Sequence, residues 1–204
     1  MDETNLINSA QNGDIEAFNR LVLAYQEQVY NVALRMLLNE DLAEDATQDA
    51  FLSAYRHISH FRGGSLRAWL LRIVTNRCYD ELRLQKRKPQ EPLHPVDGET
   101  GEEQEDPPYL RDNHDLPEEA LARKQLESAI HNCIEGLSNE YRSAVVLVDI
   151  QGLDYKQASQ VIKKPIGTLK SRLARARLGL QDCLQGAWEL LPAEYRLNQE
   201  GINE

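Results

Sequence analysis

Apolar residues recur at steps of three and four positions along most of the chain. Between residues 18 and 37 they form one continuous stripe, and similar stripes cover 43–58 and 122–137. This spacing places them on one face of an α-helix, whereas no stretch alternates convincingly with the period of two that a half-buried β-strand requires. The pattern therefore predicts an all-α protein.

Helix ends in the first half can be placed from residues that commonly cap or break helices. Asn39 or Asp41 can cap the helix that carries the second stripe. The RGGS stretch at 62–65 breaks this helix, and Ser65 can cap a third helix that runs to about Lys86. Everything before residue 88 is thus predicted to be a small helical bundle.

Helices begin again at Pro117, which suits the first turn of a helix. Ser138 can cap the next helix, which would continue to Ile150 and end at Gly152. The second half is therefore predicted to be helical as well.

Two short helices then follow in close succession. Asp154 and Gln157 form the pattern of a capping box for a helix that ends near Lys163, and another helix starts at Pro165 or Gly167. Two short helices joined by a turn of three or four residues, of which the second is basic, are typical of a helix-turn-helix.

The second of these helices separates its side chains by kind at ~100° per residue. The side expected to face the core carries Leu169, Leu173, Ala176 and Leu180. The opposite side has long donors among small residues, which would let it enter the major groove of DNA. Its members are Gly167, Lys170, Ser171, Ala174 and Arg175, with Leu178 as the discordant residue. Phosphates could be held on the flanks by Thr168, Arg172 and Arg177. A solvated cationic helix face is the alternative interpretation.

A second cationic stripe is expected on the helix that follows residue 65. It consists of Arg72, Asn76, Tyr79, Arg83 and Lys86 or Arg87. Positive charges can bind phosphates and a flat side chain can stack on bases, so the stripe is suited to binding single-stranded DNA. Trp69 lies one step round the helix, and it belongs either to this surface or to the core.

Charge is distributed unevenly along this acidic chain of net charge −10. Residues 56–88 hold 9 basic and 2 acidic side chains, whereas residues 89–119 hold 1 basic and 11 acidic ones. The latter segment is also rich in Pro and Gly, and it cannot bury enough apolar surface to offset the entropy of ordering. We therefore expect two small helical domains joined by an acidic flexible linker.

The cysteines and the lengths of the apolar runs indicate the kind of cellular compartment in which the protein works. Cys78, Cys133 and Cys183 are odd in number and far apart, which favours a reducing compartment without a disulfide framework. His131 lies near Cys133, but two ligands do not make a zinc site. No apolar run approaches the ~18 residues of a membrane span.

Three segments resemble signature segments of bacterial sigma factors. They read DLAEDATQDAFLSAYR, FRGGSLRAWLLRIVTNRCYDELR and YKQASQVIKKPIGTLKSRLARAR. The layout is similar to that of the extracytoplasmic-function (ECF, group IV) subfamily of the sigma-70 family. The resemblance implies a sigma region 2 helical bundle over 1–88, an acidic linker over 89–117 and a sigma region 4 helix-turn-helix over 118–184. Residues 185–204 would be a C-terminal extension of unknown role.

The resemblance also assigns roles to residues that match the family's motifs. Core polymerase binding would use Asp41, Glu44, Asp45, Gln48 and Asp49, although acids also favour a helix N-terminus. Reading and melting of the −10 element would use Phe61, Arg62, Ser65, Trp69, Arg72, Asn76, Tyr79 and Arg83. The loop at 60–65 would hold a flipped base. Reading of the −35 element would use Tyr155, Lys164, Thr168, Lys170, Ser171, Arg172, Arg175 and Arg177.

The implied function is that of an alternative sigma factor, which binds core RNA polymerase and directs promoter-specific initiation. Its partners would be the β′ coiled coil and β flap of the polymerase, promoter DNA and an anti-sigma factor. The implied place is the bacterial cytoplasm, at the nucleoid when the holoenzyme forms, with no membrane insertion, cofactor or metal. The linker would occupy the polymerase's positively charged path for template and RNA, or else serve as a passive tether.

No catalytic set is apparent in the sequence. It holds no glycine-rich phosphate loop with a lysine, no paired carboxylates in an apolar setting and no nucleophile with a base. Strand opening would therefore rely on binding energy, and we do not expect an enzyme. The alternative function is a conventional helix-turn-helix transcriptional regulator with an N-terminal helical interaction domain.

Overall fold

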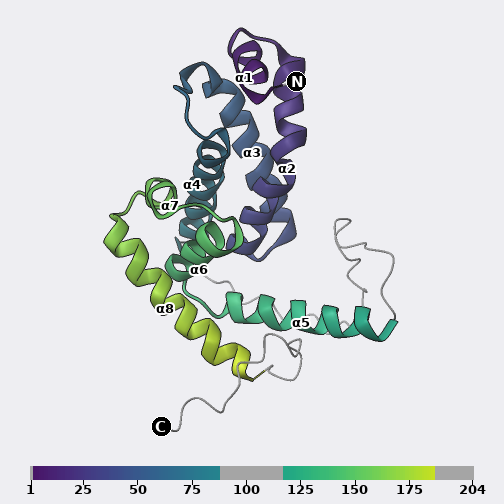
Figure 1. Ribbon diagram of the computed structural model, residues 1–204, viewed down its shortest axis with the longest axis vertical. Helices are drawn as coiled ribbons and strands as arrows, with labels where there is room; N and C mark the ends of the chain where they lie inside the picture. The colour runs from purple at the N-terminus through teal and green to yellow at the C-terminus, as the bar shows by residue number, and fades with distance from the viewer. Residues whose placement is uncertain (1, 88–116, 187–204) are drawn as a thin grey trace.

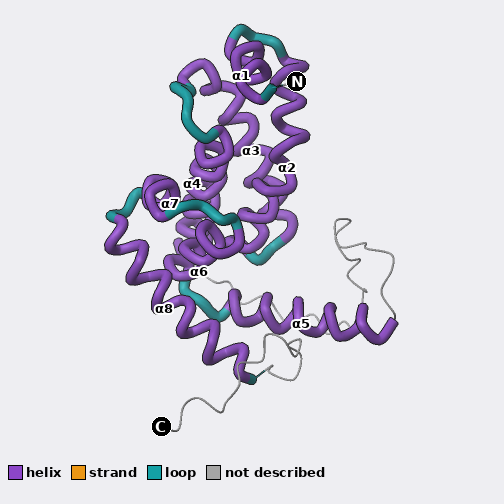
Figure 2. The backbone as a smooth tube through the Cα atoms, in the orientation of Figure 1, coloured by secondary structure: helices purple, strands orange, loops and turns teal. Residues whose placement is uncertain are grey.

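The computed structural model describes residues 2–87 and 117–186 of the chain. Helices make up almost all of these residues, and no strand occurs among them (Figure 2), so the predicted all-α fold is confirmed. The helices are α1 (Glu3–Gln11), α2 (Ile15–Leu37), α3 (Glu40–His57), η1 (Ile58–His60), α4 (Leu66–Arg87), α5 (Pro117–Glu135), α6 (Asn139–Val145), η3 (Val146–Ile150), α7 (Tyr155–Ile162) and α8 (Ile166–Gln185).

The first half is a bundle in which α2, α3 and α4 lie side by side and α1 packs against α2 (Figure 1). Asn39, rather than Asp41, caps α3, because its Oδ1 accepts a hydrogen bond from the Leu42 amide at 2.8 Å. Ser65 caps α4 as expected, with Oγ 3.1 Å from the amide nitrogen of Ala68. Small side chains bring α3 close to its neighbours, since four alanines are at most 4% exposed: Ala43, Ala46, Ala50 and Ala54.

The second half contains the predicted helix-turn-helix. Both hydrogen bonds of the capping box are present at the start of α7, from the Gln157 amide to Asp154 Oδ1 (2.7 Å) and from the Asp154 amide to Gln157 Oε1 (3.3 Å). Lys163 ends α7 with a left-handed backbone (φ 54°), and α8 begins after Pro165. The expected helix from 139 to 150 differs in two respects. The Ser138 side chain makes no capping hydrogen bond, and the second part of the helix widens into the π-helical segment η3.

The two halves pack directly against each other, which the sequence did not predict. Helix α4 lies against α7, and α2 contacts α5, α6 and η3 (Figure 1). The buried apolar side chains of both halves belong to one continuous core. The predicted linker over 89–117 lies outside the described residues except for its last position. The extension over 185–204 lies outside them beyond residue 186.

A disulfide joins Cys133, near the end of α5, to Cys183, near the end of α8. The expectation that these cysteines are unpaired was therefore wrong. Its basis was their wide separation in the sequence, but the packing of α5 on α8 brings the two positions together. Cys78 is a free thiol buried in the core.

No helix within the described ranges combines the length and the apolar character needed to cross a bilayer.

Candidate nucleic-acid and polymerase interfaces

Helix α8 presents one apolar face and one polar face. Leu169, Leu173 and Ala176 are at most 2% exposed, and Leu180 is half-buried. The opposite face is exposed at Gly167, Lys170, Ser171, Ala174 and Arg175. Leu178, the discordant residue, is 60% exposed. The predicted orientation of this helix is confirmed.

Acidic residues of α6 and η3 hold the arginines on the flanks of α8. Arg172 Nη2 lies 2.7 Å from Glu140 Oε2, and its side chain is only 14% exposed. Arg177 Nη2 lies 2.5 Å from Asp149 Oδ1, and this bond raises the pKa of Arg177. A phosphate at either flank would therefore compete with a carboxylate that already orients the guanidinium.

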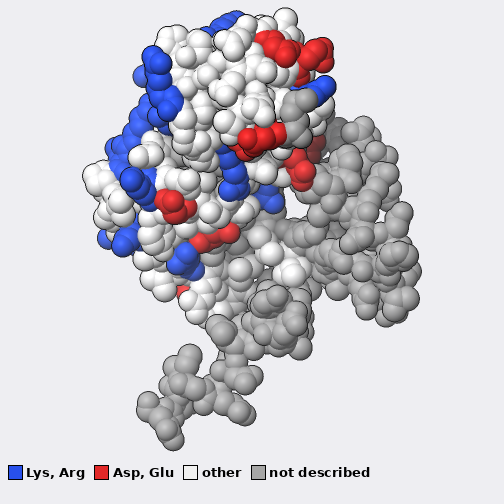
Figure 3. Space-filling model, turned by 45° about the horizontal axis from the view of Figure 1, so that its top comes forward, with Lys and Arg blue, Asp and Glu red and all other residues white. Residues whose placement is uncertain are grey.

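The remaining residues assigned to the −35 element surround this face. Lys170 Nζ lies 5.3 Å from the centre of the Tyr155 ring, so these two residues from α8 and α7 form a cation–π pair. Lys164 is exposed in the turn before α8, and Thr168 is half-buried. Figure 3 shows Lys and Arg in a column along the left edge of the molecule, the side on which α7 and the start of α8 lie in Figure 1.

The loop before α4 and the start of α4 line a hollow that both halves share. Gly63 and Gly64 adopt positive φ angles of 91° and 88°, a conformation that residues with a side chain rarely take. The hollow measures about 360 Å³ and includes Trp69 and Arg72 from α4. Its opposite wall comes from α7, with Gln157, Gln160 and Val161.

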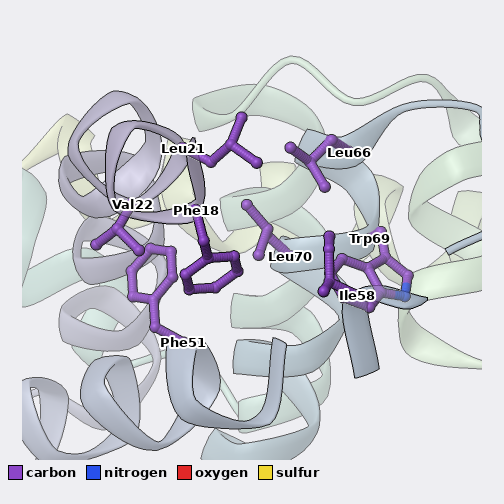
Figure 4. A pocket seen from close by; sticks show the side chains of 8 residues that line it. All are labelled: Phe18, Leu21, Val22, Phe51, Ile58, Leu66, Trp69 and Leu70. Atoms are coloured by element: carbon purple, nitrogen blue, oxygen red, sulfur yellow. The ribbon is translucent and has the colours of Figure 1, made fainter. Parts of the chain in front are cut away.

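Trp69 lies between the core and the shared hollow. Its ring lies 5.4 Å from that of Phe61, a residue that is only 8% exposed. Figure 4 shows Trp69 beside Ile58 at one end of an apolar cluster around Phe18. The cavity in this cluster is about 10 Å³, too small for a ligand. Trp69 thus packs on the core through one side and borders the shared hollow through the other.

The rest of the stripe on α4 is divided between solvent and the second half of the protein. Arg72 and Arg83 are exposed, and Arg83 pairs with Asp80 at 2.7 Å. Asn76 is half-buried. The Tyr79 hydroxyl lies 2.6 Å from Ser143 Oγ, and burial raises the pKa of this tyrosine.

Two arginines that the sequence did not single out join the halves. Arg67 Nη2 donates to the backbone oxygen and to Oε1 of Gln151, while its Nε donates to Gln28 Oε1 at 2.7 Å. The buried Arg142 donates from α6 to the Met36 carbonyl at the end of α2, at 3.1 Å. The sequence feature that could have identified them is an arginine beside an apolar run. Such an arginine is buried when the run is buried, and a buried cation needs several acceptors.

Acidic side chains gather on a separate surface of α3. Four of the five residues assigned to polymerase binding are exposed: Asp41, Glu44, Asp45 and Gln48. The fifth, Asp49, is half-buried and pairs with Arg77 of α4 at 2.6 Å. An open hollow of about 330 Å³ between α3 and α4 brings together Asp45, Gln48 and Asp49. Exposed Leu52 lies at the same hollow and adds apolar surface.

Comparison with known proteins identifies both halves. The family model "Sigma-70 region 2" matches residues 21–88, and "Sigma-70, region 4" matches residues 127–180. The RNA polymerase sigma-H factor of Pseudomonas aeruginosa is 35% identical over 88% of this chain and 92% of its own length. The ECF RNA polymerase sigma-E factor of Haemophilus influenzae is 34% identical over 88% of this chain and 94% of its own length.

A solved structure agrees with these relatives. The sigma factor RpoE of Bartonella quintana, crystallised with the anti-sigma factor NepR, has a TM-score of 0.61 and 26% identity over 82% of this chain and 96% of that one. The chain therefore belongs to the sigma-70 family of RNA polymerase sigma factors, in its ECF group, whose members direct the initiation of transcription.

Proposed function

We propose that this sigma factor uses three distinct surfaces for three tasks. The exposed polar face of α8 reads the −35 element, the surface around Trp69 on α4 reads and opens the −10 element, and the acidic hollow on α3 binds core RNA polymerase. The observation that carries the proposal is the division of α8 into a buried apolar face and an exposed face that carries Lys170, Ser171 and Arg175.

The −35 assignment follows from the geometry of α8. Small residues beside Lys170 and Arg175 let the helix backbone approach the floor of a major groove, where long donors reach base edges. Arg172 and Arg177, already oriented by carboxylates, lie at the flanks where phosphates pass. The base-reading and backbone-holding roles are thus separated on one helix.

The −10 assignment rests on the hollow beside the glycine loop. Its volume of about 360 Å³ can accommodate an unstacked base, and Trp69 offers a flat apolar surface next to it. Arg72 supplies a cation at the rim for the phosphate backbone. Because α7 forms the opposite wall, the two halves must separate before a strand of DNA can follow α4.

The polymerase assignment rests on charge and an apolar edge. Asp45 and Gln48 are exposed beside Leu52, which is 54% exposed, so the hollow offers acidic and apolar contacts to one partner. Complementary charge would guide association with a basic coiled coil more than it would add affinity. The pair between Asp49 and Arg77 fixes the direction of one carboxylate.

Control by an anti-sigma factor is proposed from the Bartonella relative, which was crystallised with one. Opening of DNA by this chain would draw on binding energy, without a catalytic reaction of its own, and would take place in the cytoplasm with polymerase. The alternative, a conventional helix-turn-helix regulator, finds no support in these observations.

Reconstituted transcription tests the proposal. The purified chain and core polymerase, with no holoenzyme added, should start RNA at a defined promoter, which a conventional regulator cannot do. Charge reversal at Asp45 and Asp49 should reduce polymerase capture at least tenfold, whereas binding to a −35 duplex should stay unchanged. The Arg77→Ala variant, which breaks the ion pair without reversing the acidic surface, is the matched control. Unchanged capture by the reversed variant would reject the polymerase assignment.

A further inference from the structure

The two cysteines of the disulfide lie at the ends of the unit that reads the −35 element. Cys133 is near the end of α5 and Cys183 near the end of α8, with their Cα atoms 5.7 Å apart. The two cysteines are separated by 50 positions in the sequence, and the segment between them includes α6, η3, α7 and almost all of α8. The bond therefore encloses the complete helix-turn-helix in one covalent loop.

The two cysteines differ in exposure to solvent. Cys133 is 6% exposed, whereas Cys183 belongs to the exposed residues of α8. An oxidant in solution can therefore reach Cys183 first, and Cys133 is held next to it to complete the bond. Since the Cα separation already lies in the range of ordinary disulfides, no backbone movement is needed.

The third cysteine does not share these properties. Cys78 is fully buried in the first half, and burial raises the pKa of its thiol to about 12. A protonated, inaccessible thiol is a poor nucleophile. Thiol chemistry in the folded protein is therefore confined to the pair in the second half.

The end of α5 is also the point where the second half is fastened. Arg142 donates to the carbonyls of Ile134, Glu135 and Leu137, which directly follow Cys133, and to the Met36 carbonyl of α2. A bond from Cys133 to Cys183 fixes the end of α8 to this same point. Among the described residues, the other contacts between α5 and α8 are packing contacts.

We propose that Cys133 and Cys183 form a redox modification site that takes a peroxide or a small-molecule disulfide as oxidant and thereby stabilises the helix-turn-helix. With hydrogen peroxide, the Cys183 thiolate attacks oxygen to give a sulfenic acid and hydroxide. The Cys133 thiolate then attacks the Cys183 sulfur, so that the S–S bond forms and hydroxide leaves, which takes a proton from solvent to become water.

The reaction with glutathione disulfide balances in the same way. Cys183 displaces one glutathione thiolate and forms a mixed disulfide, and Cys133 then displaces the second glutathione. Two protein thiols are oxidised and one glutathione disulfide is reduced to two thiols. A dithiol reductant reverses the reaction and returns the loop to its open form.

The first experiment maps the bond in the full-length protein. Reduced protein is treated with hydrogen peroxide or glutathione disulfide, digested without reductant and analysed by mass spectrometry. We expect a linked peptide that contains Cys133 and Cys183, with Cys78 unmodified. A stable glutathione adduct on Cys183, or a disulfide between two copies of the chain, would overturn the proposal.

The second experiment measures what the bond does. Closing a loop of this length restricts the unfolded chain, so the melting midpoint of oxidised protein should exceed that of reduced protein by roughly 5–15 °C. Cys183→Ser, a change at an exposed position, should melt like reduced wild type under both conditions. Equal midpoints for oxidised and reduced wild type would reject the proposal.

The expected effect of the disulfide on DNA binding rests on the −35-reading function proposed for α8. At a temperature between the two midpoints, the oxidised protein should bind a −35 duplex and the reduced protein should not. If the midpoints differ but neither form binds the duplex at low temperature, the DNA-reading role fails and the redox site stands. If both forms bind equally between the midpoints, the proposed stabilisation of the helix-turn-helix is wrong.

Discussion

Arg142 shows how a single buried cation can fix the arrangement of several helices. Its guanidinium donates to four backbone carbonyls, three at the end of α5 and one at the end of α2. Ile134, Glu135 and Met36 lie in the last turns of their helices and Leu137 lies just beyond α5, where a helix supplies few backbone donors. Burial lowers the pKa of Arg142, as expected for a cation removed from water. One side chain therefore supplies donors to carbonyls at the ends of two helices, of which the Ile134 carbonyl also accepts from the Leu137 amide.

We expect Arg142→Ala to lower the free energy of unfolding by about 2–4 kcal/mol, because buried carbonyls lose their donors. Arg142→Lys should lose less, since an ammonium keeps the charge but cannot reach all four acceptors. Urea denaturation measures the difference. Arg56→Ala, at an exposed arginine, should change stability by less than about 0.5 kcal/mol. A loss for Arg142→Ala no larger than this control would contradict the assigned role.

Residues of α8 should differ in what they contribute to DNA recognition. Arg175→Ala should cost roughly 1–3 kcal/mol at the preferred −35 sequence and relax base preference, because Arg175 lies on the base-reading face. Arg177→Ala should weaken binding to all sequences alike. It should also reduce the slope of log affinity against log salt concentration by about one. Fluorescence anisotropy with matched and altered duplexes over a salt series measures both effects.

The partner of Arg177 supplies the control for this pair of variants. Asp149→Asn removes the carboxylate that competes with phosphate, so binding to every duplex should become somewhat tighter. If Arg175→Ala leaves base preference intact, or if Arg177→Ala changes preference, the division of roles on α8 is wrong.

At the scale of elements, most helix boundaries could be predicted because local signals determine them. The capping box at Asp154 and the cap at Ser65 are encoded within four residues of the helix start, and the structure contains both. The π-helical widening of η3 was not predictable, because it depends on how Val146 and Leu147 fit the core. The pairing of Cys133 with Cys183 depends likewise on packing between helices far apart in the sequence.

The turn between α7 and α8 offers a test of local backbone energy. Lys163 is exposed and holds a left-handed backbone, which costs roughly 1–2 kcal/mol for residues that carry a Cβ. We expect Lys163→Gly to be more stable than Lys163→Ala by about 1 kcal/mol, since the two variants remove the same charge and differ at this conformation. Thermal denaturation of both proteins gives the comparison. Equal stability would mean that the turn imposes no such cost.

At the scale of the whole molecule, the sequence predicted the parts better than their arrangement. The polar face of α8 follows from helical periodicity and was placed correctly, whereas the stripe on α4 is only partly exposed, because Tyr79 bonds to Ser143 of the second half. The contact of α4 with the second half has no periodic signal, because Arg67, Ser143 and Gln151 are ordinary polar residues until the halves meet. This contact places α7 opposite Trp69, so the described arrangement closes the surface that we assign to the −10 element.

Loosening this contact should therefore improve binding to −10 DNA. Ser143→Ala combined with Gln151→Ala removes side-chain acceptors from the second half and leaves every residue of α4 in place. When only a fraction of the molecules is open, the apparent affinity is the intrinsic affinity multiplied by that fraction. The double variant should therefore bind a single-stranded −10 oligonucleotide several-fold more tightly. The expected gain cannot come from a new DNA contact, because neither changed residue belongs to the proposed −10 surface.

Fluorescence can report the opening independently of DNA. In a Trp188→Phe background Trp69 is the remaining tryptophan, and its quenching by acrylamide should increase when α7 moves away from it. Gln125→Ala with Ser128→Ala makes the same chemical changes at exposed positions of α5 and should alter neither quenching nor affinity. If the interface variant gains quenching but no affinity, the closed arrangement does not limit access to α4. If it gains neither, these two side-chain hydrogen bonds do not hold the halves together, and the remaining contacts, which include those of Arg67 and Arg142 to backbone carbonyls, are sufficient.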